Sequence, residues 1–205
     1  MIERFRGIIS RYVPESAVEY CITIWQRNPF SFKVTRQRRS KVGDYRYNKK
    51  TGNHEITVNG NLNSYAFLIT YLHEVAHLIQ FHKHGHNRSP HGWIWKKIFK
   101  ELMTPVLTPT VFPPDILGQL QIHMENPKAS SQGDPELSKR LRNYDQYDRI
   151  ELLLEDFTEG DSFILNGRAY TKLKKRRTRS LCVDERTGRK YLISEMAQVT
   201  MPGSK

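Results

Sequence analysis

Four residues between positions 73 and 91 have the types and spacing of a metal-dependent hydrolytic site. The stretch HEVAH occupies positions 73–77, and His91 follows after a polar loop. Histidines four positions apart lie on one face of a helix, so the imidazoles of His73 and His77 can reach one metal ion. Glu74 can contact a metal-bound water without binding the metal. Zinc lowers the pKa of such a water and a carboxylate accepts its proton, which is the chemistry of metal-assisted peptide hydrolysis.

A catalytic zinc ion needs a third protein ligand and an open position for water. A histidine six residues after His77 would be one solution, but Lys83 occupies that position. Glu101 is a candidate on a later helix, near its C-terminal end. His91 follows Ser89-Pro90, an N-cap and first-turn pair, so we expect it at the rigid start of a helix and predict it as the third ligand. The alternatives lie in the polar loop: His82, His84 and His86.

The flanking sequence predicts the elements that position these residues. Helical spacing of apolar residues, with cap residues at Asn61 and Asn63, predicts a long helix over 64–82 that carries the HEVAH motif. Further helices are expected at 5–12, 14–27, 90–102 and 116–124. Strands are expected at 31–36 and in a hairpin over 44–60 whose turn contains Gly52.

The chain changes character after position 125. ENPKASSQGDPELS (125–138) has the composition of a linker, and one more helical piece extends to about 149. Two hairpins follow, around Asn166-Gly167 and around a turn containing Gly188. We therefore predict an α+β protein with a first domain over 1–125, a linker and short helix over 126–149, and a small basic β-rich module over 150–205, for which an SH3-like barrel is one possible form.

The charge balance favours a polyanionic partner. The chain has 33 Lys and Arg against 21 Asp and Glu, a net charge of +12, and such a surface attracts nucleic acid. Two cysteines far apart in sequence exclude a disulfide framework. No stretch approaches the roughly 20 apolar residues of a membrane span, and the N-terminal residues lack a signal-peptide pattern. We expect a cytoplasmic protein without a membrane partner, located at the nucleoid if it acts on DNA.

Two clusters of basic residues are candidate nucleic-acid contacts. The first cluster contains Arg36, Arg38, Arg39 and Lys41; the second contains Lys172, Lys174, Lys175, Arg176, Arg177 and Arg179. Neither belongs to a motif that reads bases, so binding would be to phosphates, independent of sequence and sensitive to salt, and single-stranded DNA is a suitable partner. The alternative is that each cluster is a solvated strand face whose charges discourage edge pairing.

The metal motif and its surroundings resemble a known family. HEVAHLIQF, a polar loop and SPHGWIWKKIFKEL are similar to the SprT-like zinc metalloproteases, which include Spartan, and the resemblance covers about 1–125. It implies a zincin-like domain with helices packed on a small antiparallel sheet. It also implies one catalytic Zn²⁺ held by His73, His77 and His91, with Glu74 as general base. The cysteine-rich zinc ribbon of several members is missing, because Cys182 is the only cysteine after Cys21.

Three functions are compatible with these features. Eukaryotic members of the family cleave proteins cross-linked to DNA, so the resemblance implies a zinc endopeptidase that acts on DNA-bound or DNA-cross-linked proteins. A nucleic-acid-binding protein with a structural zinc and no proteolysis is the first alternative, and His84 or His86 would be its fourth ligand. A hydrolase of another amide is the second. The sequence does not predict the oligomeric state.

Overall fold

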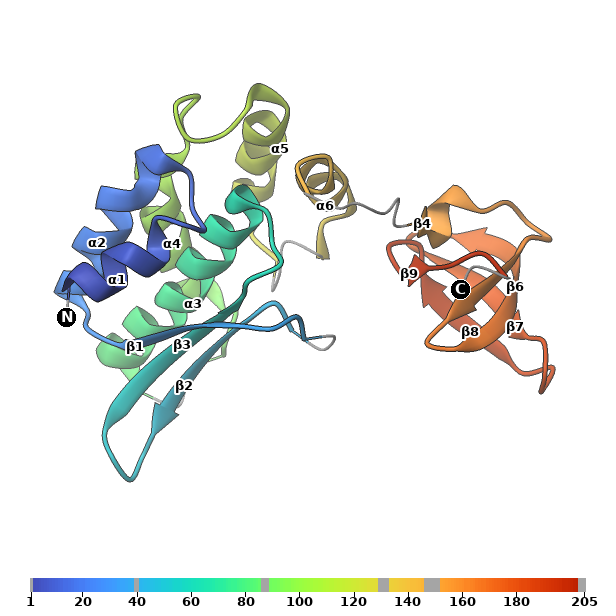
Figure 1. The fold of residues 1–205 in the computed structure, drawn as a ribbon, viewed down its shortest axis with the longest axis horizontal. Coiled ribbons are helices and arrows are strands. Elements are labelled where there is room, and N and C mark those ends of the chain that lie inside the picture. Colours follow the sequence, from blue (N-terminus) through green and yellow to red (C-terminus); the bar gives the residue numbers. More distant parts are fainter. Residues whose placement is uncertain (1, 39–40, 86–88, 129–132, 146–151, 203–205) are drawn as a thin grey trace. The chain divides into compact units, whose positions relative to one another are not determined.

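The computed structural model describes residues 2–38, 41–85, 89–128, 133–145 and 152–202, and Figure 1 shows their fold. The chain forms two compact units, Met1–Asp145 and Gln146–Lys205. The described part of the first unit contains helices and strands, and that of the second contains strands and a short 3-10 helix. The α+β prediction is therefore confirmed. The division between the units falls at 145/146, so the described part of the predicted linker segment belongs to the first unit.

The first unit contains a three-stranded sheet. Its strands are β1 (Ser31–Thr35), β2 (Gly43–Asn48) and β3 (Asn53–Asn59), in the order β1-β3-β2. The predicted hairpin is β2–β3, and Gly52 adopts a φ of 70° in its turn. The expectation of an antiparallel sheet is wrong for β1, which runs parallel to β3. The strand β3 lies between β1 and β2, parallel to β1 and antiparallel to β2.

The described part of the first unit contains six α-helices. They are α1 (Ile2–Ile9), α2 (Val18–Arg27), α3 (Ser64–His84), α4 (Trp93–Met103), α5 (Pro114–Glu125) and α6 (Pro135–Arg142). The helix α3 packs against β2, β3 and α4 (Figure 1). Asn63 caps it by accepting a hydrogen bond from the Ala66 N–H, and Gly85 ends it with a φ of 68°. No helix in the described ranges has the length and apolarity of a membrane span.

The start of α4 differs from the sequence prediction. Ser89 was expected as the N-cap, but the helix begins at Trp93 and its N-cap is Gly92. The Gly92 N–H donates to the Ser89 carbonyl, which closes a turn, and the Lys96 N–H makes the first helical bond to the Gly92 carbonyl. His91 consequently lies in a turn that leads into α4, one residue before the cap, and not in the first helical turn.

Aromatic packing holds α3 in place. Tyr71 of α3 is fully buried among Phe30 and Phe32, with ring centroids 6.2 and 5.7 Å away, and its hydroxyl donates to the Cys21 carbonyl at 3.1 Å. Phe5 of α1 stacks on Trp25 of α2 in the same core. Contacts of this kind from both neighbouring helices and β1 leave α3 one position, because interiors pack at crystal-like density.

The second unit is built from short strands. They are β4 (Leu152–Leu153), β5 (Ser162–Leu165), β6 (Arg168–Arg176), β7 (Arg179–Asp184), β8 (Lys190–Ser194) and β9 (Gln198–Val199). The strands β5 to β8 form an antiparallel sheet in chain order, and β4 pairs with β9. Asn166 and Gly167 both have positive φ, as the predicted Asn-Gly hairpin turn requires, and Gly188 lies in the turn between β7 and β8. Both predicted hairpins are confirmed.

Asp134 connects α5 to α6 inside the first unit, and its charge should make the stability of this unit depend on pH. Its carboxylate accepts hydrogen bonds from His123 Nδ1 at 2.9 Å and from the Leu137 N–H. Burial would raise the pKa of Asp134, but these bonds outweigh burial and lower it. A carboxyl whose pKa is lowered by folding stabilises the fold above its unfolded pKa, near 4, and this contribution disappears as the pH falls through the lowered value.

We expect the Asp134→Asn substitution to reduce the free energy of unfolding by about 1–2 kcal/mol at pH 7, because a hydrogen bond to a charged acceptor becomes neutral. The difference from the wild-type chain should shrink below about pH 4. Urea unfolding followed by tryptophan fluorescence at several pH values measures both quantities. A difference that stays constant with pH would contradict the role assigned to the Asp134 charge.

Candidate metal centre

Three histidines from α3 and the turn before α4 converge on one point. The Nε2 atom of His77 is 3.1 Å from that of His73 and 3.1 Å from that of His91, and the remaining pair is 3.2 Å apart. His73 and His77 are one helical turn apart on α3, as their spacing predicts. Gln80 of α3 donates to the Ser89 carbonyl at 3.1 Å, which holds the turn that carries His91 against the helix.

The arrangement of these nitrogens fits a metal ion better than it fits hydrogen bonds. Each Nε2 of a neutral imidazole is either a donor or an acceptor. With three nitrogens and two roles, at least one of the three contacts must join two donors or two lone pairs, which repel. Three lone pairs directed at one cation remove this conflict. Tetrahedral zinc with metal–nitrogen bonds of about 2.0–2.1 Å has nitrogen–nitrogen edges of about 3.3 Å, close to the observed separations. These three residues could therefore hold a metal ion.

An aromatic wall lies behind the three histidines. Trp95 of α4 is fully buried, and its ring centroid is 4.5, 5.4 and 4.8 Å from those of His73, His77 and His91. Burial lowers the pKa of His73 to about 2 and that of His77 to about 4, with neighbouring histidines acting in the same direction. Both imidazoles are therefore neutral near pH 7, the form that binds metals.

Glu74 lies against the first residues of β2. The residue is 7% exposed, and its carboxylate accepts a hydrogen bond from the Tyr45 backbone N–H. Burial raises the pKa of Glu74 to about 8, and the nearby Asp44 carboxylate acts in the same direction. A carboxyl with a pKa near neutrality is suited to accept and release a proton at that pH.

Gly43 makes room for this carboxylate, a role that the sequence analysis missed. A Cβ atom at position 43 would lie 2.5 Å from Glu74 Oε1 and 2.6 Å from the Thr70 methyl group. Both distances are shorter than van der Waals contact allows, so only glycine fits without displacing Glu74. The glycine is the first residue of β2, one position before the predicted hairpin over 44–60, and no sequence signal marked it.

The other candidate ligands lie elsewhere. His82 and His84 were expected in a loop, but they belong to the last turn of α3, and His82 faces His54 and not the triad. The loop prediction failed because α3 continues to His84 and ends only at its C-cap, Gly85. Glu101 is exposed on α4. His86 lies outside the described residues. Within the described part of the chain, His73, His77 and His91 form the cluster of metal-binding types.

A comparison with family models identifies this region. Residues 16–117 match the SprT-like family. The first unit contains an SprT-like domain. The match includes all three histidines and Glu74, and it confirms the resemblance seen in the HEVAH motif and the residues around His91. The SprT-like family is associated with metallopeptidase activity and typically with zinc. No curated protein and no solved structure matches the chain.

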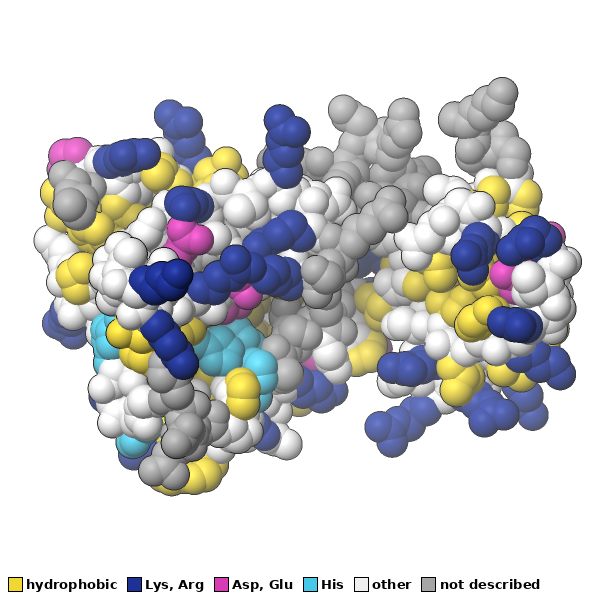
Figure 2. Space-filling model, turned by 90° about the horizontal axis from the view of Figure 1, so that it is seen from below, with side chains coloured by type: hydrophobic (Ala, Val, Ile, Leu, Met, Phe, Trp, Pro, Cys, Tyr) yellow, Lys and Arg dark blue, Asp and Glu magenta, His cyan; other side chains and the backbone are white. Residues whose placement is uncertain are grey.

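The first basic cluster lies near the SprT-like site. On the face shown in Figure 2, Lys and Arg side chains gather beside the histidines of the first unit. Arg36 is exposed, and Lys41 forms an ion pair with Asp44 at 2.8 Å. Arg38 donates to Thr57 and Asn59 of β3 at 2.9 and 2.8 Å. The charges of Arg38 and Lys41 both lower the pKa of Glu74, so this segment borders the site. Arg39 lies outside the described residues.

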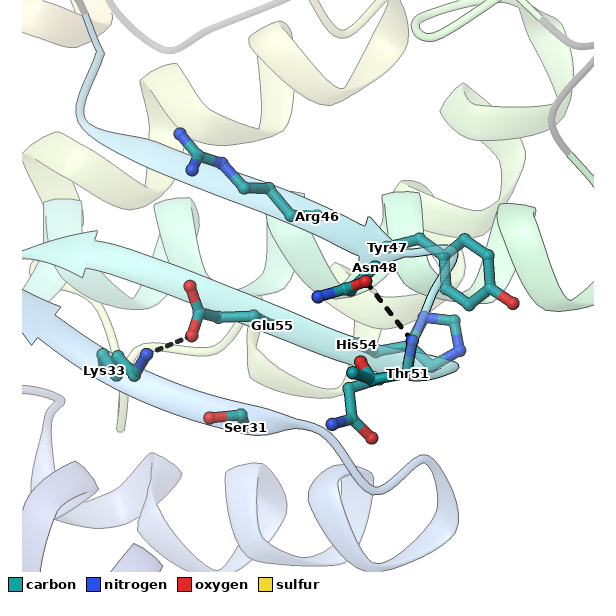
Figure 3. A pocket seen from close by; sticks show the side chains of 9 residues that line it. Ser31, Lys33, Arg46, Tyr47, Asn48, Thr51, His54 and Glu55 are labelled. Atoms are coloured by element: carbon teal, nitrogen blue, oxygen red, sulfur yellow. Dashed lines mark hydrogen bonds and ion pairs between the residues drawn. The ribbon is translucent and has the colours of Figure 1, made fainter.

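An open hollow of about 600 Å³ lies along the sheet, apart from the three histidines (Figure 3). Its walls are polar and include Lys33 of β1, Arg46 of β2 and Glu55 of β3. Lys33 and Glu55 form an ion pair across it. None of the three converging histidines lines the hollow, so the chemistry of the site does not depend on it.

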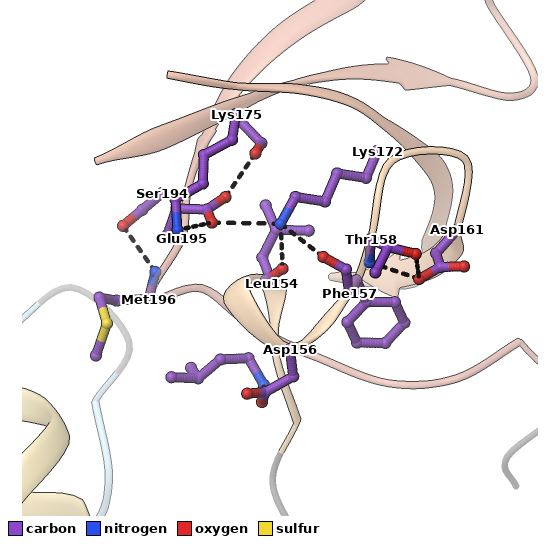
Figure 4. A network of polar contacts seen from close by, with 12 residues as sticks. Leu154, Asp156, Phe157, Thr158, Asp161, Lys172, Lys175, Ser194, Glu195 and Met196 are labelled. Atoms are coloured by element: carbon purple, nitrogen blue, oxygen red, sulfur yellow. Dashed lines mark hydrogen bonds and ion pairs between the residues drawn. The ribbon is translucent and has the colours of Figure 1, made fainter. Parts of the chain in front are cut away.

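Lys172, predicted as a nucleic-acid contact, is buried in the second unit (Figure 4). Its ammonium donates to the carbonyls of Leu154 and Phe157 at 2.7 and 2.9 Å and to the Glu195 carboxylate at 3.3 Å. The prediction is therefore wrong for this residue. Strand alternation directs Lys172 inward, on the side of Tyr170, where these three acceptors satisfy its ammonium group.

The rest of the second cluster is exposed around the β6–β7 turn. It comprises Lys174, Lys175, Arg176, Arg177 and Arg179. Lys175 also pairs with Glu195 at 3.2 Å. The register of β6 against β7 shifts between Lys172 and Lys174, which separates the buried lysine from the exposed run. A hairpin end with this charge is accessible to phosphates.

The metal centre should depend on His91 and not on the histidines at the end of α3. We expect His91→Ala to weaken Zn²⁺ binding by more than the roughly 10–100-fold that loss of an outer hydrogen-bond partner costs, because a direct ligand is lost. His84→Ala is the matched control and should keep the wild-type affinity. Competition with a zinc-binding dye measures both variants. Equal tight binding by wild-type and His91→Ala protein would contradict the three-histidine centre.

Proposed function

We propose that this protein is a zinc-dependent endopeptidase of the SprT type. The observation that carries the proposal is the convergence of three imidazole nitrogens, with the buried carboxylate of Glu74 on the same helix as two of them, within a domain of that family. His73, His77 and His91 would hold one Zn²⁺, and Glu74 would be the general base. We also propose that the first unit has a zincin-like fold and that the second is an SH3-like module.

The residues of the site have separate tasks in peptide hydrolysis. Zinc in such a centre acts as a Lewis acid and makes water acidic enough to lose a proton near neutral pH. The three imidazoles stay neutral and fixed against Trp95. Glu74 accepts the proton of the attacking water at its carboxylate and passes it to the amide nitrogen as the C–N bond breaks. The Tyr45 N–H and the space at Gly43 keep this carboxylate in place.

The strand β2 is a suitable platform for a protein substrate. It lies at the edge of its sheet and pairs with β3 on one side only, within the described residues. Backbone groups on the free edge of a strand can pair with an extended peptide. Because Glu74 contacts β2 at Tyr45, a peptide on this edge would pass directly beside the base. Unfolded or flexible protein segments are therefore the expected substrates.

We further propose that DNA brings the enzyme to its substrates, which would be DNA-bound or DNA-cross-linked proteins. The support is the net charge of +12 and the exposed basic residues on both units. Arg38 and Lys41 lie close enough to Glu74 to lower its pKa, Arg36 is exposed in the same segment, and five exposed basic residues lie around the β6–β7 turn of the second unit. Contacts would be to phosphates, so the enzyme would bind DNA without regard to sequence, single strands included, at the nucleoid.

Substitution of Glu74 should separate metal binding from catalysis. We expect Glu74→Gln to bind Zn²⁺ as the wild type does but to cleave at least about 100-fold more slowly, because the amide cannot accept the proton. Gly43→Ala should also keep zinc and lose about 100-fold in kcat, since its methyl group displaces the carboxylate. Cleavage of a DNA-binding protein by the zinc-loaded chain, with and without single-stranded DNA, is the assay.

Gly7→Ala is the matched control for Gly43→Ala, because a Cβ at position 7 meets no atom within 4 Å. It should cleave at the wild-type rate. Wild-type proteolysis by Glu74→Gln would refute the mechanism. Slow cleavage by Gly43→Ala together with loss of zinc would show that glycine supports the fold of the centre and not the position of the base.

The basic turn of the second unit should contribute a salt-dependent part of DNA affinity. We expect the combined substitution of Arg176, Arg177 and Arg179 by Gln to reduce the slope of log affinity against log salt by about 2, since each phosphate contact on a single strand contributes about 0.7. Substitution of Arg4, Arg11 and Arg27, which are exposed on α1, the turn after it and α2, is the control of equal charge. Fluorescence anisotropy with a single-stranded oligonucleotide measures the slope for each variant. Equal slopes for the two triple variants would exclude the turn as a DNA contact.

A further inference from the structure

Two histidines that the metal centre does not use face each other at the far end of α3. His82 lies in the last turn of α3, and His54 lies near the start of β3. Their Nε2 atoms are 3.1 Å apart, and the rings are perpendicular with centroids separated by 4.5 Å. The separation of the nitrogens equals that within the triad. Two potential metal ligands are thus brought together from elements that are distant in sequence.

The hairpin β2–β3 fixes the orientation of His54. Tyr45 Oη is 2.9 Å from His54 Nδ1. Tyr47 lies beside the imidazole at the hairpin end (Figure 3), with centroids 4.9 Å apart, and Phe81 packs on it at 5.4 Å. Metal-binding histidines usually have their second ring nitrogen held by an outer partner in this way, which fixes the ring and the tautomer. Nε2 of His54 is therefore directed at His82.

We propose that His54 and His82 form a second site for a divalent transition-metal ion such as Zn²⁺, separate from the three-histidine centre. Imidazole nitrogens suit zinc, copper and nickel. His82 is exposed and His54 is half-buried, so water can complete the coordination. The histidine pair supplies one protein ligand fewer than the triad, and its affinity is accordingly lower. Its ion exchanges under conditions that leave the triad loaded.

An ion at this site would link two parts of the first unit. It would join β3 to the last turn of α3, three residues before Gly85 ends the helix. Tyr45, which orients His54 through its side chain, also donates its backbone N–H to Glu74. The second site is therefore connected to the hairpin that positions the catalytic carboxylate. A ligand that binds only the folded state raises its stability, so the thermal midpoint of the full chain rises with Zn²⁺ beyond one equivalent.

Equilibrium dialysis of the full chain against Zn²⁺, followed by metal analysis, tests the proposal. Wild-type protein takes up two equivalents, the second more weakly. His82→Ala, a substitution at an exposed position, takes up the first equivalent alone, whereas His84→Ala on the same exposed turn takes up both. Tyr45→Phe keeps the backbone contact to Glu74 but weakens the second equivalent by about tenfold or more, because the outer partner of His54 is lost.

The variant His91→Ala distinguishes the two sites, because it loses the tight equivalent and keeps the weak one. Uptake of a single equivalent by the wild type overturns the proposal. So does an unchanged second equivalent in His82→Ala, or its loss in His84→Ala. These readouts do not involve proteolysis, so the second site can fail while the endopeptidase function holds, and the reverse.

Discussion

The packing of α3 between the sheet and α4 is the constraint on which the site depends. Tyr71 and the aromatic side chains around it leave the helix a single position. The same helix buries Glu74 and half-buries His73 and His77, and unpaired polar groups are costly where water is scarce. Each of them consequently needs a partner: the imidazoles converge with His91, and the carboxylate meets the Tyr45 N–H. The apolar packing that fixes α3 therefore also positions the polar residues of the site.

The edge strand β2 and the segment before it provide further contacts of the site. Glu74 can reach its place only because position 43 lacks a side chain. The basic segment that precedes β2 adds positive charge on the same side, through Arg38 and Lys41. Substrate platform, base and basic surface are thus parts of one strand and its approach. Under the proposed function, this arrangement would bring the basic surface and the site of cleavage together on one strand and the segment before it.

The sequence predicted those features that arise from local spacing or turn chemistry. The separation of four residues between His73 and His77 determines their common face, and Asn166-Gly167 determines its hairpin. Features that depend on tertiary contacts were missed. Gly43 is explained by a side chain 31 positions away, at Glu74 (74 − 43 = 31). Lys172 belongs to a basic run, yet strand alternation and three buried acceptors take it inside.

The topology of the first sheet shows the same limit. Hairpin signals identify β2 and β3 as antiparallel neighbours, but no local signal states that β1 pairs with β3 in parallel. The predicted start of α4 was also wrong. Ser89-Pro90 satisfies the rules for a helix start, but these residues form the turn 89–92, and the helix begins after it. In both cases the sequence satisfies a local rule, but contacts in the folded chain determine a different structure.

X-ray absorption at the zinc edge of the protein loaded with one equivalent tests the central claim most directly. Three imidazole nitrogens and one oxygen at about 2.0–2.1 Å are expected if His73, His77 and His91 hold a catalytic ion with an open position. Four protein ligands, with a fourth imidazole in place of the oxygen, would contradict the account. The ion would then be structural, and the basic surfaces would belong to a nucleic-acid-binding protein without proteolysis.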